Sequence, residues 1–129
     1  MRKCIFILLV ILAVSYRLEA KKQEVVMPSG KEIYIPKDLR GMDLQNPDSK
    51  WSYHRMAYTD NFVIFWEKGF GNDLSNPPQL EGHDMKVDLS NLTEKLESFY
   101  HFFRDTLKFS KPGSKCDKYR MMVMLNYSL

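Results

Sequence analysis

The sequence TDNFVIFWEKGFG, from Thr59 to Gly71, contains the clearest buried strand of the chain and the glycine-rich turn that ends it. Successive side chains of a strand point to opposite faces, and every residue from Phe62 to Trp66 is apolar, so both faces of this strand are apolar. Such a strand needs neighbouring strands and a covering layer. We therefore expect a strand near residues 61–68 that is covered on both sides.

An amphipathic helix is predicted near residues 91–109. Asn91, with Glu94 three residues later, is typical of a helix start, and Pro112 with Gly113 supplies a stop. Apolar residues recur at spacings of four and three, which predicts one face that lies on a sheet. These residues are Leu92, Leu96, Phe99, Phe103 and Leu107. The opposite face, with His101, is expected to face water.

A second strand is predicted near residues 119–128, where Met121 to Leu125 form a continuous apolar run. The order strand, loop, helix, strand is that of a βαβ crossover with two parallel strands. The predicted fold class is therefore α/β, with α+β as the alternative, built on a partial βαβ unit. The second strand needs neighbours on both faces that the rest of the sequence does not easily supply. We therefore expect an incomplete domain from a reading frame that is cut short.

The segment that precedes the first strand, residues 21–58, is predicted to be an N-terminal arm with loops, and residues 59–129 to be part of an α/β domain. Lys31 to Ile35 alternates enough for a short strand ended by a proline. Residues 37–50 have no sustained period, so we expect a loop with at most one helical turn.

Residues 1–20 have the three parts of a secretory signal peptide. Two basic residues come first, an apolar run covers residues 5–14, and the small residue Ala20 precedes the expected cleavage point. The apolar run is about half the ~20 residues that span a bilayer, so we expect no transmembrane span after cleavage. The sequence predicts export to the periplasm, the cell surface or the medium.

The net charge of the chain is too small to indicate binding to nucleic acid or to an anionic membrane surface. The formal net charge is +3, and removal of Arg2, Lys3, Arg17 and Glu19 with the signal peptide leaves +1. Proteins that bind nucleic acid through its phosphates carry clustered basic residues. We therefore expect no nucleic-acid partner.

An aromatic cluster is the main candidate for a binding surface. Trp51, Tyr53 and Tyr58 lie close in sequence, and Phe70 follows the first strand at the start of a long loop over residues 69–86. Aromatic rings bind sugars and peptides, and long loops without secondary structure are often functional. The alternative is that these rings pack against the sheet. A peptide or a glycan is the ligand that this surface predicts.

Gly69 and Gly71 follow the first strand, at the place where phosphate-binding loops occur. No helix follows directly, and the spacing fits neither common nucleotide fingerprint. We therefore expect turn glycines with positive φ and no phosphate site.

Three stretches of the chain carry a resemblance to a known family. They are WSYHR at residues 51–55, DNFVIFWEKGFG at residues 60–71 and YRMMVMLNYSL at residues 119–129. Together they resemble the opening of the bacterial exported zincin-like metallopeptidases, which are large and mostly uncharacterised proteins. In zincins this arrangement precedes a helix with the motif His-Glu-x-x-His, whose histidines bind zinc and whose glutamate is the general base.

The zinc-binding motif is absent from this chain. His54, His83 and His101 are isolated, and none of them is followed by glutamate. No catalytic residue, metal ligand or cofactor is therefore predicted here, although the resemblance implies zinc for the full-length family. The resemblance implies a scaffold fragment of a metallopeptidase-like domain and not a working enzyme. The alternative is a small exported module that binds a glycan or a protein.

Overall fold

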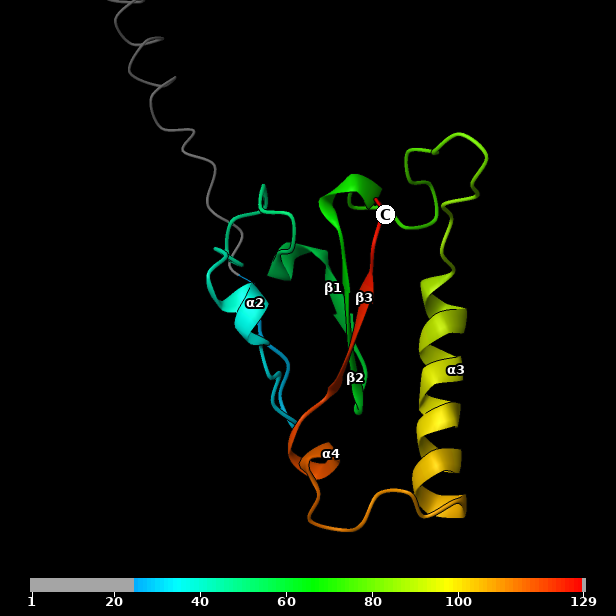
Figure 1. The fold of residues 1–129 in the computed structure, drawn as a ribbon. Coiled ribbons are helices and arrows are strands. Elements are labelled where there is room, and N and C mark those ends of the chain that lie inside the picture. The colour runs from blue at the N-terminus through cyan, green and yellow to red at the C-terminus, as the bar shows by residue number, and fades with distance from the viewer. Residues whose placement is uncertain (1–24, 129) are drawn as a thin grey trace, which may run out of the picture.

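The computed structural model describes residues 25–128 and has a three-stranded mixed sheet with helices (Figure 1). The strands are β1 (Met56–Tyr58), β2 (Phe62–Trp66) and β3 (Met121–Leu125). The helical segments are α2 (Lys37–Arg40), a 3-10 turn (Tyr53–Arg55), a second 3-10 turn (Lys68–Phe70), α3 (Leu89–His101), a π-helix (Phe102–Thr106) and α4 (Lys115–Lys118).

The sheet has the order β1-β2-β3. β2 pairs antiparallel with β1 and parallel with β3, and Ile64 lies opposite Val123 in the parallel pair. The chain passes from β2 to β3 through α3, so the predicted βαβ crossover is confirmed. The fold is a small α/β fold, as the sequence predicts. β1, which pairs with β2 across a tight turn, was not expected.

β2 is the centre of the core. All of its side chains are buried, and Val63, Ile64 and Phe65 have no exposed surface. Its two faces contact different layers, because alternate side chains point to opposite sides. The prediction of a strand covered on both sides is therefore confirmed.

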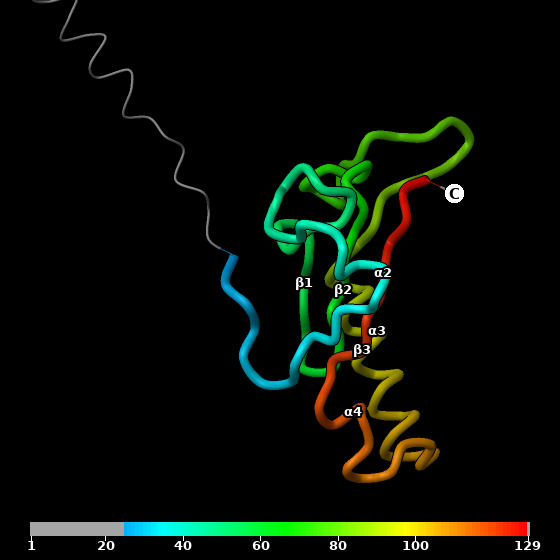
Figure 2. Tube along the Cα trace, turned by 60° about the vertical axis from the view of Figure 1, so that its left-hand side comes forward, coloured from blue at the N-terminus to red at the C-terminus, as the bar shows by residue number. Residues whose placement is uncertain are grey.

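The N-terminal part of the chain covers one face of the sheet. Leu39, Leu44 and Trp51 are buried against Val63 and Phe65. The arm that contains α2 lies on the opposite side of the sheet from α3 in Figures 1 and 2. β3 is covered in part on this face, because Met122 and Met124 pack, partly buried, against this cluster. Residues from the arm pack against the same cluster, and they include Ile33, Ile35 and Met42.

α3 covers the other face of the sheet with the first two residues of the predicted stripe and with Tyr100, which the stripe did not include. Tyr100 is buried against Phe62 and Ile64, and Leu92 and Leu96 pack on the same cluster. These three helix residues lie four apart and share one face.

The end of the predicted stripe turns away from the sheet. Phe99 is 57% exposed and Leu107 is 45% exposed, so the stripe was wrong at these positions. The α-helix ends at His101 and continues as a π-helix, whose wider turn changes the direction of every later side chain. His101 faces solvent, as predicted.

α3 begins earlier than the sequence indicated. The predicted cap was Asn91, but the carboxylate of Asp88 accepts a hydrogen bond from the Asn91 backbone N–H at 2.9 Å. Asp88 is therefore the N-cap, and Asn91 lies in the first turn.

Two smaller expectations about the arm have different outcomes. Residues 31–35 form no strand, because only Glu32 pairs, in an isolated parallel bridge with Tyr119. The single helical turn expected within residues 37–50 is present as α2. The predicted boundary near residue 58 falls between β1 and β2, which pair in one sheet.

The predicted signal peptide and its cleavage site at Ala20 lie outside the described residues. Among residues 25–128, no helix has the length and apolar character needed to cross a membrane. Gly71 has a φ of 70°, as expected of a turn glycine. Gly69 does not have a positive φ, because it lies inside a 3-10 turn.

Candidate ligand-binding groove

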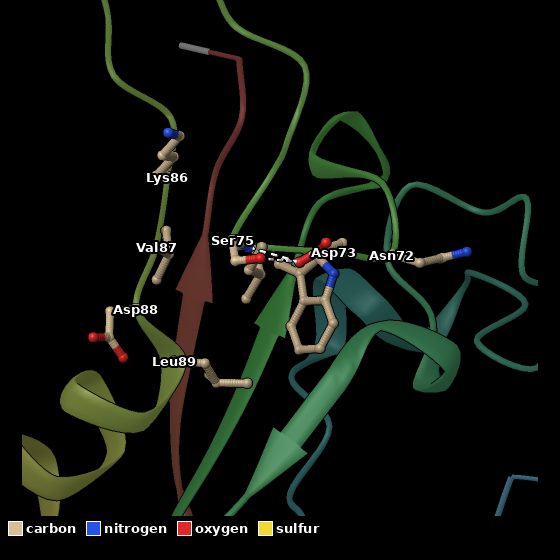
Figure 3. A pocket seen from close by; sticks show the side chains of 9 residues that line it. Asn72, Asp73, Ser75, Lys86, Val87, Asp88 and Leu89 are labelled. Carbon is tan, nitrogen blue, oxygen red and sulfur yellow. Dashed lines mark hydrogen bonds between the residues drawn. The ribbon is translucent and has the colours of Figure 1, made fainter.

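An open groove of about 540 Å³ lies where β2 ends and α3 begins (Figure 3). Two chain segments form its walls: residues 72–75, which follow the turn after β2, and residues 86–89, which lead into α3. The lining residues are Trp66, Asn72, Asp73, Leu74, Ser75, Lys86, Val87, Asp88 and Leu89. The groove is therefore built from the two ends of the long loop that the sequence singled out.

The floor of the groove is apolar. Trp66 and Leu74 are buried, and Val87 and Leu89 pack partly buried against them. The Trp66 indole N–H donates a hydrogen bond to the Gly71 carbonyl at 3.0 Å, which fixes the ring in the floor. Tryptophan buried with its N–H satisfied gives a rigid surface for an apolar ligand group.

The two walls are tied together by the backbone. The Val87 N–H donates to the Leu74 carbonyl at 2.9 Å. Asp88 caps α3 next to this bond, so the wall that contains Val87 continues directly into a helix. The groove therefore stands on ordered elements and not only on loop residues.

Polar groups form the rim. The Asp73 carboxylate accepts hydrogen bonds from the Ser75 hydroxyl at 2.7 Å and from the Ser75 N–H at 2.9 Å. These bonds lower the pKa of Asp73 below its usual value, so the carboxylate is charged at neutral pH. Asn72 and Lys86 are exposed and, with Asp88, add an amide, an ammonium and a second carboxylate.

The residues that line the groove include few groups that could react with a ligand. No histidine or cysteine lines it, and its only hydroxyl, on Ser75, donates to Asp73. A nucleophile needs a base within hydrogen-bond reach and a third group that orients the base, and the lining residues do not provide this arrangement. An apolar floor with a few polar groups on the rim is typical of a ligand site.

A buried carboxylate fixes the chain beside the groove. Glu67, which directly follows β2, is 7% exposed and accepts hydrogen bonds from the Tyr127 N–H at 2.9 Å and the Ser128 hydroxyl at 3.0 Å. Lys50 lies 3.4 Å away. Burial raises the pKa of Glu67, but the hydrogen bonds prevail and lower it below its usual value. Glu67 is therefore a charged structural anchor for residues 127–128.

A second carboxylate network lies at the other end of β2. Glu97 on α3 accepts from the Asn61 side chain at 2.7 Å, from the Asn61 N–H at 2.9 Å and from the Thr59 hydroxyl. Burial raises the pKa of Glu97, and these bonds prevail and lower it. The network joins α3 to the turn between β1 and β2, which is a structural role.

The four predicted binding residues do not form one surface. Trp51 and Phe70 are 5% and 4% exposed, and they lie in different core clusters. Tyr53 is half-buried, with its ring 6.0 Å from that of Phe65, and Tyr58 is exposed. Three of the four rings therefore pack in or against the core, which is the alternative that the sequence left open.

The residues of the groove rim were not predicted from the sequence as site residues. Asp73 and Ser75 form an Asx-type turn, and Asp88 is a helix cap, and both signals are readable in a sequence. Neither signal says that the two segments meet. Only the fold brings residues 72–75 beside residues 86–89.

The described residues do not fit zinc. His54 Nε2 lies 3.1 Å from the Gln45 carbonyl, and His101 Nδ1 lies 3.0 Å from Asp105. His83 pairs through its backbone with Leu80. Within residues 25–128, no three His, Cys, Asp or Glu side chains are grouped closely enough to hold a metal ion. The Glu97 and His101 pair supplies only two groups, and structural or catalytic zinc needs three or four protein ligands.

Comparison with known proteins identifies a family but no activity. The model of DUF6055, a family of unknown function, matches residues 25–129. Comparisons with curated proteins and with solved structures give no match. The relationship to zincin-like metallopeptidases stays a hypothesis from the sequence. Because the match spans most of the chain, this chain belongs to the DUF6055 family.

Proposed function

We propose that this chain is an exported, non-catalytic scaffold of a zincin-like metallopeptidase type, which positions a peptide in its groove. The observation that carries the proposal is the groove at the carboxyl end of β2, beside the helix of a βαβ crossover. Ligands of open α/β sheets bind outside the carboxyl ends of the strands, where connections to helices leave a crevice. The order of β2, α3 and β3 is also the order that the family resemblance implies.

The scaffold role is proposed because the chain lacks the zinc-binding motif of the zincins. The sequence has no His-Glu-x-x-His motif, and the described histidines are apart from one another and from the groove lining. The chain contributes a rigid sheet and a binding surface, while zinc chemistry belongs to the full-length proteins of the family that it resembles.

A zinc titration tests the scaffold proposal. We expect added zinc to leave the midpoint of thermal unfolding unchanged, because a metal that binds only the folded state would raise it. We also expect casein-derived peptides to survive incubation with the chain and zinc. Stoichiometric zinc binding together with peptide hydrolysis would contradict the proposal.

A second candidate function is a small exported binding module. The groove favours it, because an apolar floor and a charged rim suit an extended peptide or a glycan without further chemistry. Screening by tryptophan fluorescence against a peptide library and an oligosaccharide panel separates the two ligand classes, since Trp66 lies in the floor.

A groove-filling variant makes this screen specific. Ser75→Trp would occupy the groove and is expected to abolish binding. Lys37→Trp, at an exposed position of α2 on the arm, is the matched control and is expected to bind normally. Equal binding by both variants would place the ligand elsewhere.

Export is the remaining part of the proposal. We expect cleavage after Ala20, because the preceding residues have the order of a signal peptide. N-terminal sequencing of the product from the periplasm or the medium should begin at Lys21. A chain that stays in the cytoplasm with Met1 retained would contradict export.

A further inference from the structure

An aromatic patch covers the end of α3 and the π-helix that continues it. Its exposed fractions are 57% at Phe99, 52% at Phe102, 45% at Leu107 and 67% at Phe109. The ring of Phe103 lies between two of them, with centroids 5.7 Å from Phe99 and 4.8 Å from Phe109. We call these five residues the aromatic patch. Contiguous exposed apolar surface of this kind marks an interaction site.

The backbone is shaped to present the aromatic patch. The π-helix over residues 102–106 widens the last turn, and Lys108 has a φ of 57°, which is the left-handed region. This reversal lets the Phe109 N–H donate to the Phe103 carbonyl at 3.3 Å and brings the two rings together. π-helical turns and left-handed residues other than glycine are both costly and are found at functional sites.

Lysines surround the aromatic patch. Lys95 lies one turn before Phe99, and Lys108 and Lys111 flank Phe109. All three are exposed, and none forms an ion pair within the described part of the chain.

The two carboxylates that follow in this region are already engaged. Asp105 lies 3.0 Å from His101, and Asp117 pairs with Arg104. His101 carries a charge only when protonated, so Asp105 counts as a negative charge, and the exposed Glu94 next to Lys95 is another. Lys95, Lys108 and Lys111 outnumber these two carboxylates by one. The surface is therefore both apolar and basic.

We propose that the aromatic patch docks the protein on an anionic lipid bilayer. Phenylalanine and leucine enter the boundary between headgroups and acyl chains, and lysines at the edge contact acidic headgroups. The groove described above lies at the opposite end of α3, and its lining includes no patch residue. Exposed phenylalanines with lysines at their edge match the apolar and cationic faces of segments that bind at a membrane surface.

The aromatic patch is separate from the groove. It lies at the other end of α3 and would bind a different class of partner. A failure of peptide binding in the groove would leave the docking proposal standing, and the reverse also holds.

A tryptophan reporter in the full chain tests the proposal. Phe109→Trp places an indole in the patch, while Trp51 and Trp66 are buried and give a constant background. Tyr34→Trp, on the arm and 53% exposed, is the matched control. The probe is a vesicle of equal parts phosphatidylglycerol and phosphatidylcholine with brominated acyl chains.

Insertion should be local to the patch. We expect the Phe109→Trp emission to shift to shorter wavelength and to be quenched by the brominated chains, with no change for Tyr34→Trp. Because only the reporter position is read, lipid binding by residues 1–24 does not produce this difference. Equal quenching of both reporters, or none at Phe109→Trp, would overturn the proposal.

The lysines should control the affinity. Replacement of Lys95, Lys108 and Lys111 by glutamate is expected to weaken partitioning by at least about fivefold per lysine, as for basic residues near an anionic surface. Vesicles of phosphatidylcholine alone should bind at least tenfold more weakly. Unchanged partitioning in either case would overturn the proposal.

Self-association is the competing result. A chain that forms dimers through the patch without vesicles would show a concentration-dependent size, and this size would fall to that of a monomer in the Phe99→Ser, Phe109→Ser variant. That outcome would assign the patch to a second copy and overturn membrane docking.

Discussion

Glycine is required at position 69 because a larger residue would clash with the Tyr127 side chain, and not because of the backbone angles at this position. A Cβ atom built at this position overlaps the Cβ, Cγ and Cδ1 atoms of Tyr127. These atoms lie at the base of the side chain, which cannot move without the backbone of residues 127–128. The same ring packs edge-on against Phe70, with centroids 5.3 Å apart. The turn after β2 and the segment after β3 are therefore fitted to each other.

Gly69→Ala is expected to destabilise the protein by about 1–3 kcal/mol, the usual cost of overpacking. Urea unfolding measures the effect. Gly41→Ala is the control, since a Cβ there meets no atom within 4 Å and its φ is −82°. Its change should stay within about 0.5 kcal/mol. Equal effects of the two substitutions would show that the Tyr127 contact is not the cause.

Glu67 gives stability a defined dependence on pH. Its pKa is lower in the folded protein than the usual value of 4.5, so the carboxylate stabilises the fold fully above that value. As the pH falls from about 4.5 through the folded pKa, this contribution is lost, because the hydrogen bonds from Tyr127 and Ser128 need the ionised acceptor.

Glu67→Gln should therefore cost about 1–3 kcal/mol at pH 7 and less at pH 3. Unfolding by urea at both pH values measures the difference between the two proteins. Asp73→Asn is the matched control for Glu67→Gln. The pKa of Asp73 is also lowered, but by local hydrogen bonds to Ser75 in an exposed turn. A Glu67→Gln cost that is the same at both pH values would contradict the anchor role.

α3 shows where the pattern of apolar residues in the sequence and the structure differ. Periodicity predicted a helix that lies on the sheet, but it continued the stripe through Phe99 and Phe103 to Leu107. The structure buries Tyr100 and exposes Phe99, because the face that meets β2 follows a spacing of four from Leu92. The π-helix then directs the later aromatic residues toward solvent. A pattern of apolar residues cannot distinguish core rings from rings of an exposed patch.

The start of α3 provides a direct test of the cap. Asp88→Ala should destabilise the protein by about 1 kcal/mol, because the Asn91 N–H loses its acceptor. Asn91→Ala, at the cap position that the sequence predicted, should change stability by less than about 0.5 kcal/mol, since alanine is favourable in a first turn. Thermal or urea unfolding separates the two positions. A larger loss of stability for Asn91→Ala than for Asp88→Ala would show that Asn91, and not Asp88, is the N-cap.

Arg120 connects distant parts of the whole molecule. Its guanidinium is buried and donates to the Thr59 carbonyl at 2.6 Å, the Ser29 carbonyl at 2.8 Å and the Lys31 carbonyl. The ring of Tyr58 lies 5.5 Å from it. One side chain at the start of β3 therefore holds the arm and the turn between β1 and β2. A planar group with several donors suits this role, which lysine cannot reproduce.

Arg120→Met is expected to cost about 2–3 kcal/mol, because buried carbonyls lose a charged donor. The arm should loosen first, and hydrogen exchange at the Glu32 amide, which bonds to Lys118, reports this. Arg40→Met is the control, since Arg40 is exposed, donates to the Ile35 carbonyl and lies over the exposed Tyr34 ring. Unchanged exchange at Glu32 would show that the arm is held by apolar packing alone.

The sequence by itself determined the local elements. Residues from Phe62 to Trp66 and from Met121 to Leu125 are apolar on both faces, and a strand with this pattern has to be buried between layers. The helix, its crossover and the α/β class follow from the order of these elements. Short-range chemistry decides such features, so they can be read from neighbouring residues.

Only the tertiary structure decided which surfaces face solvent. The arm that covers one face of the sheet carries no sustained periodic signal, and the cluster that it shares with Met122 and Met124 joins residues about 80 positions apart. The groove likewise needs two loop ends to meet, and the aromatic patch needs a π-turn and a reversal at Lys108. These features arise from contacts between distant segments, and a local pattern contains no information about which segments meet.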